Sequence, residues 1–201
     1  MSLGVHRRKA FALLLAGGFL LPAASGCHGD AEPGPIRADP LNALYIVEGR
    51  DIRLTGGRSE VEAAPGSTAK VITSVIGAPV SGDLDGESGE DAALILARSP
   101  GGSGTFYYVA AFLDSARGSR GTNAVLLGDR VAPYDVTIEQ RHILVNYADR
   151  RPGEPMTTTP SVGRSLRLAV RDGRLAVVEA SGTEGAHSKF TRSPTKGDGG
   201  K

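Results

Sequence analysis

Short apolar runs separated by glycine, proline and acidic residues recur throughout residues 41–179. Many contain β-branched or aromatic side chains, and a length of three to nine residues is typical of strands rather than of helices. Strands this short and this frequent predict an all-β domain, mainly antiparallel, arranged as a sandwich or a partly open barrel. The eleven runs are residues 44–47, 52–54, 59–62, 70–76, 92–97, 105–113, 123–127, 136–139, 142–147, 166–170 and 174–178.

Three local patterns refine this prediction. The runs at residues 92–97 and 105–113 are the most apolar, so we expect central strands that are buried on both faces. Asp172-Gly173 predicts a two-residue type I′ turn, and Gly56-Gly57 predicts a hairpin between the second and third runs. Residues 109–117 also contain helix formers, which makes them the expected place for one short helix.

The two ends of the chain differ from this domain in composition. Three basic residues, an apolar run at residues 10–21 and small residues before the single cysteine, Cys27, have the layout of an export signal. Residues 28–40 are rich in proline, glycine and charge, and residues 180–201 are almost devoid of large apolar side chains. The chain is therefore predicted to comprise a signal peptide at 1–26, Cys27 and a flexible spacer at 27–40, one β domain at 41–179 and a disordered tail at 180–201.

The residues just before Cys27 resemble the lipobox of bacterial lipoproteins. That resemblance implies a mature chain that begins at Cys27, with a diacylglyceryl group on its sulfur and palmitate-like acyl chains as a membrane anchor. Two alternatives remain open: cleavage after Gly26 that leaves a free thiol, and a permanent span of residues 10–21, which at twelve residues is short of the roughly 20 that a bilayer requires. His28 stands where some lipoproteins carry an inner-membrane retention aspartate, so the outer membrane or cell surface is expected.

Residues 82–91 form an acidic loop with five carboxylates and no basic residue. Calcium takes six to eight oxygen ligands, and alternating side chains of a tight loop can supply them. Asp83, Asp85, Glu87 and Asp91 stand at loop positions one, three, five and nine, a spacing that resembles the calcium loops of EF-hands, dockerins and FG-GAP repeats. Glu87 and the residue after it depart from that pattern, so a calcium site and a solvated acidic turn are both open.

The charge balance argues against nucleic acid as a partner. Residues 1–26 hold three basic and no acidic residues, which leaves 20 basic and 22 acidic residues in the rest of the chain. Proteins that bind polyanions show a basic excess or a basic face.

Three patterns that suggest catalysis have simpler explanations. Ser67 and Lys70 match the S-x-x-K motif of penicillin-binding proteins, but that motif lies on a helix, whereas Lys70 here enters a strand pattern. Residues 101–104 have neither the lysine of a phosphate loop nor the spacing of a nucleophile elbow, so we interpret them as a hairpin loop. His142 is the single histidine within residues 41–179, and we expect it at the edge of a strand.

The segments GSGTFYYVAA (102–111), GTNAVLLGDR (121–130) and VNYADR (145–150) resemble a group of bacterial secreted proteins and lipoproteins of unassigned function. The resemblance covers most of residues 41–168 and implies a shared domain without an activity. We therefore expect a noncatalytic, membrane-anchored envelope lipoprotein that binds an envelope protein or glycan or has a structural role. The alternative is a small envelope hydrolase or enzyme inhibitor with a site formed by Asp129, Arg130, Asp149 and Arg150.

Overall fold

A computed structural model describes residues 39–116 and 118–182, and in this part of the chain nearly all regular structure is β. A single 3-10 turn, η1 (Pro40–Asn42), precedes the strands, and Asp39 caps it by accepting a hydrogen bond from the Leu41 N–H. The strands are β1 (Leu44–Val47), β2 (Arg50–Arg53), β3 (Arg58–Glu62), β4 (Lys70–Gly82), β5 (Asp91–Ser99), β6 (Phe106–Ser115), β7 (Gly118–Gly121), β8 (Val125–Asp129), β9 (Ala132–Glu139), β10 (His142–Asp149), β11 (Val162–Arg171) and β12 (Arg174–Ser181).

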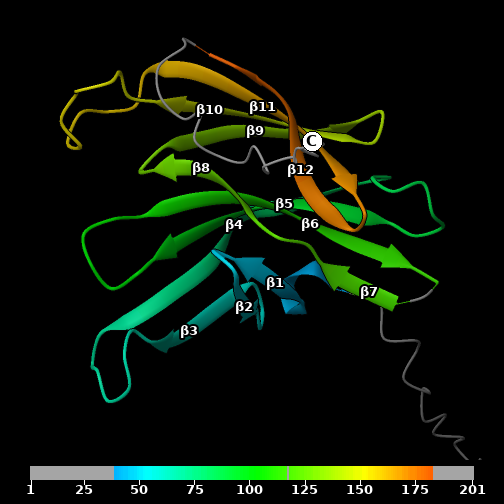
Figure 1. Cartoon of the computed structure of the whole chain (residues 1–201), viewed down its shortest axis with the longest axis horizontal. Helices are drawn as coiled ribbons and strands as arrows, with labels where there is room; N and C mark the ends of the chain where they lie inside the picture. Colours follow the sequence, from blue (N-terminus) through cyan, green and yellow to red (C-terminus); the bar gives the residue numbers. More distant parts are fainter. Residues whose placement is uncertain (1–38, 117, 183–201) are drawn as a thin grey trace, which may run out of the picture. The chain divides into compact units, whose positions relative to one another are not determined.

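The strands form three open antiparallel sheets (Figure 1). One has the order β12-β11-β10-β9, and the next has the order β3-β4-β5-β6-β7, with β8 also paired to β6. The third is the β1–β2 hairpin. The all-β antiparallel prediction is thus confirmed, and the sandwich form applies because no sheet closes into a barrel.

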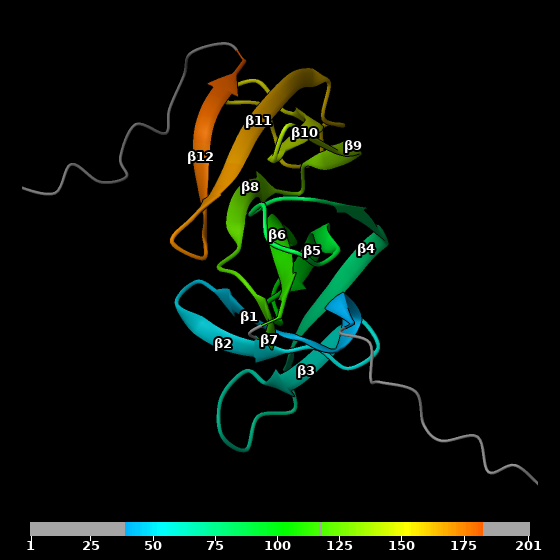
Figure 2. The same cartoon turned by 90° about the vertical axis from the view of Figure 1, so that its right-hand side faces the viewer.

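The four-stranded and six-stranded sheets are stacked on one another (Figure 2), and one hydrophobic core lies between them. Ile95 and Val109 contribute from β5 and β6, and Ile143 and Leu168 contribute from β10 and β11. Because side chains alternate along a strand, only every second residue of these strands faces this core. The opposite face of the four-stranded sheet therefore points away from the core.

A second core lies on the other face of β5 and β6, which the β1–β2 hairpin covers. Leu94, Leu96 and Tyr108 pack there against Tyr45 and Val47 of the hairpin. The prediction of central strands buried on both faces is therefore confirmed for β5 and β6. Six consecutive residues in each strand are buried, which explains why their sequences read as continuous apolar runs.

A partly buried polar cluster links the β1–β2 hairpin to this face. The Glu48 carboxylate accepts a hydrogen bond from the Tyr108 hydroxyl at 2.6 Å and forms an ion pair with Arg98, whose side chain is only 8% exposed. Glu48 and Gly49 both have positive φ angles, of 53° and 75°, so the turn that carries the carboxylate has the geometry of a type I′ hairpin.

The turn predictions had mixed outcomes. Asp172 and Gly173 have φ angles of 52° and 69° between β11 and β12, which confirms the type I′ turn. Gly56 and Gly57 do form the predicted turn, with φ angles of 57° and 79° and an antiparallel Thr55–Arg58 bridge across it. The predicted hairpin does not extend beyond that bridge, because β2 pairs with β1 and β3 pairs with β4.

The short helix predicted at residues 109–117 is also wrong where the structure describes it. Residues 109–115 belong to β6, because Ala110 and Ala111 are buried by the hairpin on one face and by the four-stranded sheet on the other. Burial on two faces outweighs the helix propensity of these alanines. The glycine-rich strand β7 was not predicted.

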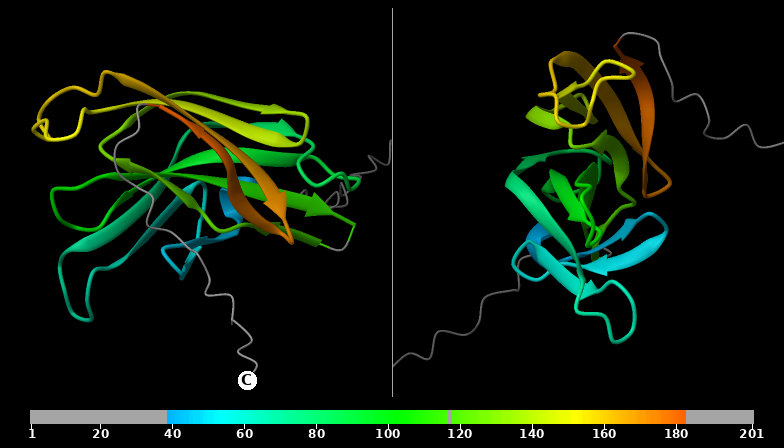
Figure 3. Two further views of the ribbon diagram at one scale, coloured as in Figure 1. Left: turned by 45° about the horizontal axis from the view of Figure 1, so that its top comes forward. Right: turned by 90° about the vertical axis from the view of Figure 1, so that its left-hand side faces the viewer.

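Asn123 lies between β7 and β8 and links the six-stranded sheet to β12 of the four-stranded sheet. Its side-chain amide exchanges two hydrogen bonds with the backbone of Leu175 in β12, at 3.0 and 2.9 Å. The β11–β12 hairpin forms one margin of the four-stranded sheet in both views of Figure 3. Cys27, the predicted signal peptide and most of the predicted spacer and tail lie outside the described residues. Within the described residues, no helix is long and apolar enough to span a membrane.

Candidate functional site

The acidic loop connects β4 to β5 and brings together three of its four predicted ligands. Carboxylate oxygens of Asp83, Asp85 and Asp91 lie within 4.8 Å of one another. Glu87 is not part of this group. Three converging carboxylates could hold a cation, and the contacts that each of them already makes determine how readily.

Asp91 is buried and serves as the hydrogen-bond acceptor around which the loop folds. It is 1% exposed, and its two oxygens accept backbone N–H bonds from Leu84 at 2.8 Å, Asp85 at 3.3 Å and Asp114 at 2.9 Å. Burial raises the pKa of the Asp91 carboxyl, and these N–H bonds offset only part of that shift. The residue therefore has a structural role, since it joins both ends of the loop to β6.

The other two carboxylates are also engaged. Asp83 accepts the Gly86 N–H at 2.6 Å and forms an ion pair with Arg141 at 3.3 Å, and Asp85 accepts the Glu87 N–H at 2.8 Å. A side chain at Gly86 would meet the guanidinium of Arg141, with its Cβ only 2.4 Å from Cζ. The loop is therefore closed by protein groups, and Arg141 occupies the space beside it.

The S-x-x-K residues do not face each other as a nucleophile and base would. Ser67 lies in the β3–β4 connection and accepts the Ala69 N–H at 3.1 Å. Lys70 begins β4 and forms an ion pair with Glu62 of β3 at 3.7 Å. Residues 101–104 lie in the loop between the paired strands β5 and β6, as predicted.

The Asp129, Arg130, Asp149 and Arg150 group does meet at one corner, where it holds loops in place. Asp129 accepts the Thr105 N–H at 3.1 Å, and Arg150 donates to the Arg130 carbonyl at 2.9 Å. Asp149 forms an ion pair with Arg164 at 2.9 Å. These contacts give the group a structural explanation, as ion pairs and backbone bonds between neighbouring segments.

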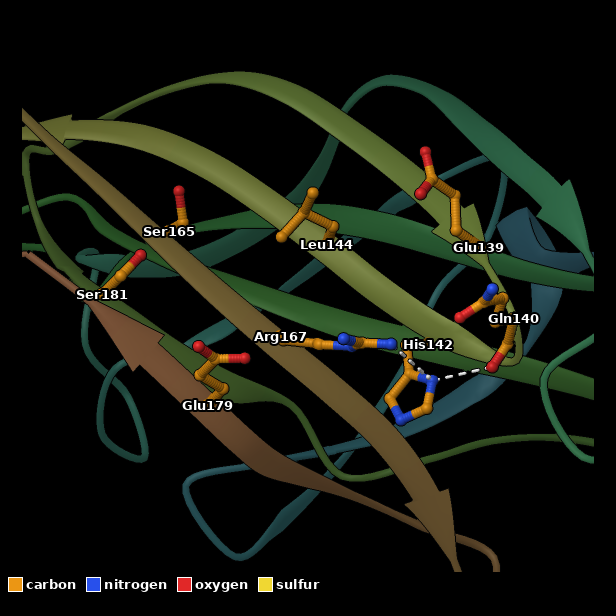
Figure 4. A pocket seen from close by; sticks show the side chains of 8 residues that line it. All are labelled: Glu139, Gln140, His142, Leu144, Ser165, Arg167, Glu179 and Ser181. Carbon is orange, nitrogen blue, oxygen red and sulfur yellow. Dashed lines mark hydrogen bonds between the residues drawn. The ribbon is translucent and has the colours of Figure 1, made fainter.

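A groove of about 370 Å³ lies on the outer face of the four-stranded sheet (Figure 4). We call it the outer groove, and three rows of side chains that lie opposite one another in the strand register form it. The first row pairs His142 with Glu139, the second runs through Leu144 and Arg167 to Glu179, and the third pairs Ser165 with Ser181. The lining residues are Glu139, Gln140, His142, Leu144, Ser165, Arg167, Glu179 and Ser181.

Arg167 and His142 are the basic side chains of this groove, and both are half-buried. In Figure 4, Arg167 extends along the sheet towards His142, and its Nη2 lies 3.5 Å from the ring Nδ1. That ring nitrogen is 2.7 Å from the Gln140 carbonyl oxygen. Because a carbonyl oxygen can only accept, Nδ1 carries the proton and donates to Gln140.

The turn that carries Gln140 is strained. Gln140 and Arg141 have φ angles of 50° and 62°, although neither is glycine. This turn joins the two regions, because Gln140 orients His142 in the outer groove while Arg141 binds Asp83 of the acidic loop.

His142 lies at a strand edge, as predicted, although its sequence context indicated no function and nothing in the sequence singled out Arg167. Polar residues do alternate with apolar ones in β10 and β11, which marks an outward face. Which outward residues meet depends on strand order and register, and a single sequence gives neither. Comparison of the chain with protein-family models, curated proteins and solved structures found no match in any of the three.

Proposed function

We propose that this chain is a lipid-anchored bacterial envelope protein whose β domain binds its ligand noncatalytically through the outer groove. The observation that carries the proposal is the half-buried pair of Arg167 and His142 in a groove on a sheet face that the core does not use. The lipobox-type approach to Cys27 supports export and anchoring at the outer membrane or cell surface.

The binding role is supported by a difference between the charged groups of the acidic loop and corner and those of the outer groove. The carboxylates at the corner and in the acidic loop accept backbone N–H groups or bind arginine, and these contacts maintain the fold. The groove side chains come from rigid neighbouring strands, which hold recognition groups in fixed positions without a large ordering cost.

Photocrosslinking in intact cells tests the binding site. A photoreactive residue at the groove rim, replacing Gln140, should capture an envelope component. The same residue at Val61, which is 49% exposed on β3 and remote in the sheet order, is the matched control and should capture little. Equal capture at both positions, or none at Gln140, would contradict the proposal.

The anchor has its own test. Labelling with an alkyne fatty acid should mark the unchanged chain, and Cys27→Ser should abolish the label. Equal label in both chains would overturn the anchor while leaving the binding result intact.

Calcium in the acidic loop is a separate proposal, supported by the convergence of Asp83, Asp85 and Asp91. An ion there has to displace Arg141 from Asp83, so we expect Arg141→Gln to bind calcium more tightly than the unchanged chain. Calorimetry with calcium alone, together with melting temperatures, measures this. If neither chain gives heat or a shifted melting temperature at millimolar calcium, the calcium proposal is wrong.

A further inference from the structure

We propose that the ligand of the outer groove is an acidic saccharide, with its carboxylate on Arg167 and its hydroxyl groups on the surrounding glutamates and serines. This inference rests on the proposed function, and it goes further by naming the chemical class of the ligand. Three features of the groove carry it: a guanidinium that pairs with no carboxylate of the described residues, a histidine of defined tautomer, and a rim that holds both acceptors and hydroxyls.

Arg167 is available to an anion. Glu179 lies opposite it in the register, yet among the described residues Arg167 forms no ion pair, and its one polar contact is with His142. That contact is not a hydrogen bond in the assigned tautomer, because Nδ1 of His142 donates its proton to Gln140 and cannot also accept from a guanidinium 3.5 Å away. The guanidinium therefore keeps its parallel N–H donors for a carboxylate, which it binds in a bidentate manner.

His142 adds a second recognition group beside the first. With the Nδ1 proton committed to the Gln140 carbonyl, Nε2 of the neutral ring is an acceptor and can receive a sugar hydroxyl. The backbone of the strained turn fixes the ring orientation, so the acceptor points in a defined direction before the ligand arrives.

The remaining lining residues suit hydroxyl groups. Glu139 and Glu179 are exposed carboxylates on opposite strands, and sugar hydroxyls donate strong charge-assisted hydrogen bonds to such groups. Ser165 and Ser181 can both donate and accept, and Leu144 offers the one apolar surface, for the C–H face of a sugar ring.

The same carboxylates disfavour other anions. A phosphate carries up to two negative charges, and Glu139 and Glu179 would repel it more strongly than they repel a single carboxylate. A neutral saccharide would leave the Arg167 guanidinium without an anionic partner. The balance of one arginine against flanking glutamates therefore selects a singly charged acid group on a hydroxyl-rich ligand.

Calorimetric titration of the full chain carrying Cys27→Ser with a trisaccharide that holds a single galacturonate residue tests the inference. The matched probe is the same trisaccharide with that carboxylate reduced to an alcohol. We expect the acidic trisaccharide to bind at least tenfold more tightly, because a charge-assisted bidentate contact is worth about a factor of ten or more. Equal affinities, or no binding of the acidic sugar, would overturn the inference.

Variants locate the contact. Arg167→Gln should lose tenfold or more in affinity, Arg167→Lys should lose less because it keeps the charge without the fork, and Arg174→Gln should bind as the unchanged chain. Arg174 is exposed at the start of β12 and does not line the groove. Wild-type affinity in Arg167→Gln would contradict the assignment, and a melting temperature for each variant shows that it is folded. Capture of a neutral glycan or a protein at Gln140 would retain the proposed function while this inference fails.

Discussion

The acidic loop and the outer groove both gather charged side chains, but they use them in opposite ways. In the loop, Asp91 accepts three backbone N–H groups and Asp83 binds Arg141, so the protein satisfies its own charges. In the groove, Arg167 has no carboxylate partner among the described residues. The difference supports a structural role for the carboxylates of the loop, whereas no such role is evident for Arg167 among the described residues.

The two regions also differ in how the chain assembles them. The loop draws its carboxylates from residues 83–91, whereas the groove draws its side chains from four strands spread over residues 139–181. The strained Gln140–Arg141 turn contacts both regions. Substitutions in the two regions therefore distinguish residues that support the fold from residues that serve recognition.

Asp91→Ala should give the largest loss of stability. It removes the acceptor of three backbone N–H groups at a site that is 1% exposed, and leaving such donors unsatisfied costs about 3 kcal/mol or more. Urea unfolding measures the change in the free energy of unfolding. The control is Glu90→Ala, an exposed neighbour, which should change stability by less than about 0.5 kcal/mol. Similar results for both variants would show that the loop does not depend on Asp91.

The stability difference between the unchanged chain and Asp91→Asn should depend on pH. Burial raises the folded-state pKa of Asp91 above its unfolded value, so the folded state holds this proton more tightly. That contribution is fully present below the unfolded pKa of about 3.8 and is lost as pH rises through the folded value. As pH falls from 7 to 3, the free energy of unfolding of the unchanged chain should therefore rise relative to that of Asp91→Asn. A constant difference would mean that the pKa of Asp91 is not raised.

How much the sequence predicted follows the same division between local and long-range information. The β class, the eleven strands and the Asp172-Gly173 turn rest on local patterns, and the structure contains all of them. The predicted pairing of β2 with the third run was wrong, because strand pairing depends on contacts that a local pattern does not contain. The helix predicted around Ala110 and Ala111 was wrong for the same reason, since burial on two faces is not visible in the local sequence. The acidic loop was visible for the same local reason, while Arg167 was missed because its neighbours lie on other strands.

Replacing Gln140-Arg141 by Asn-Gly should stabilise the domain by about 1 kcal/mol. Both residues have positive φ angles, which asparagine and glycine adopt at lower cost. The exposed Arg141–Asp83 ion pair that is lost contributes little. Thermal unfolding measures the gain, and Asp172→Asn at another type I′ turn, already followed by glycine, is a control that should change little. A net loss of stability would show that Arg141 supports the acidic loop more than its exposure suggests.

Arg167→Gln should have the smallest effect on stability, less than about 0.5 kcal/mol, although it should abolish most saccharide binding. The side chain lies on the outer face and has no ion pair among the described residues, so its removal leaves no buried group without a partner. Urea unfolding measured beside the Asp91 variant gives the comparison directly. A loss above 1 kcal/mol would assign Arg167 to the fold, as Asp91 is, and would remove the reason for treating its donors as reserved for a ligand.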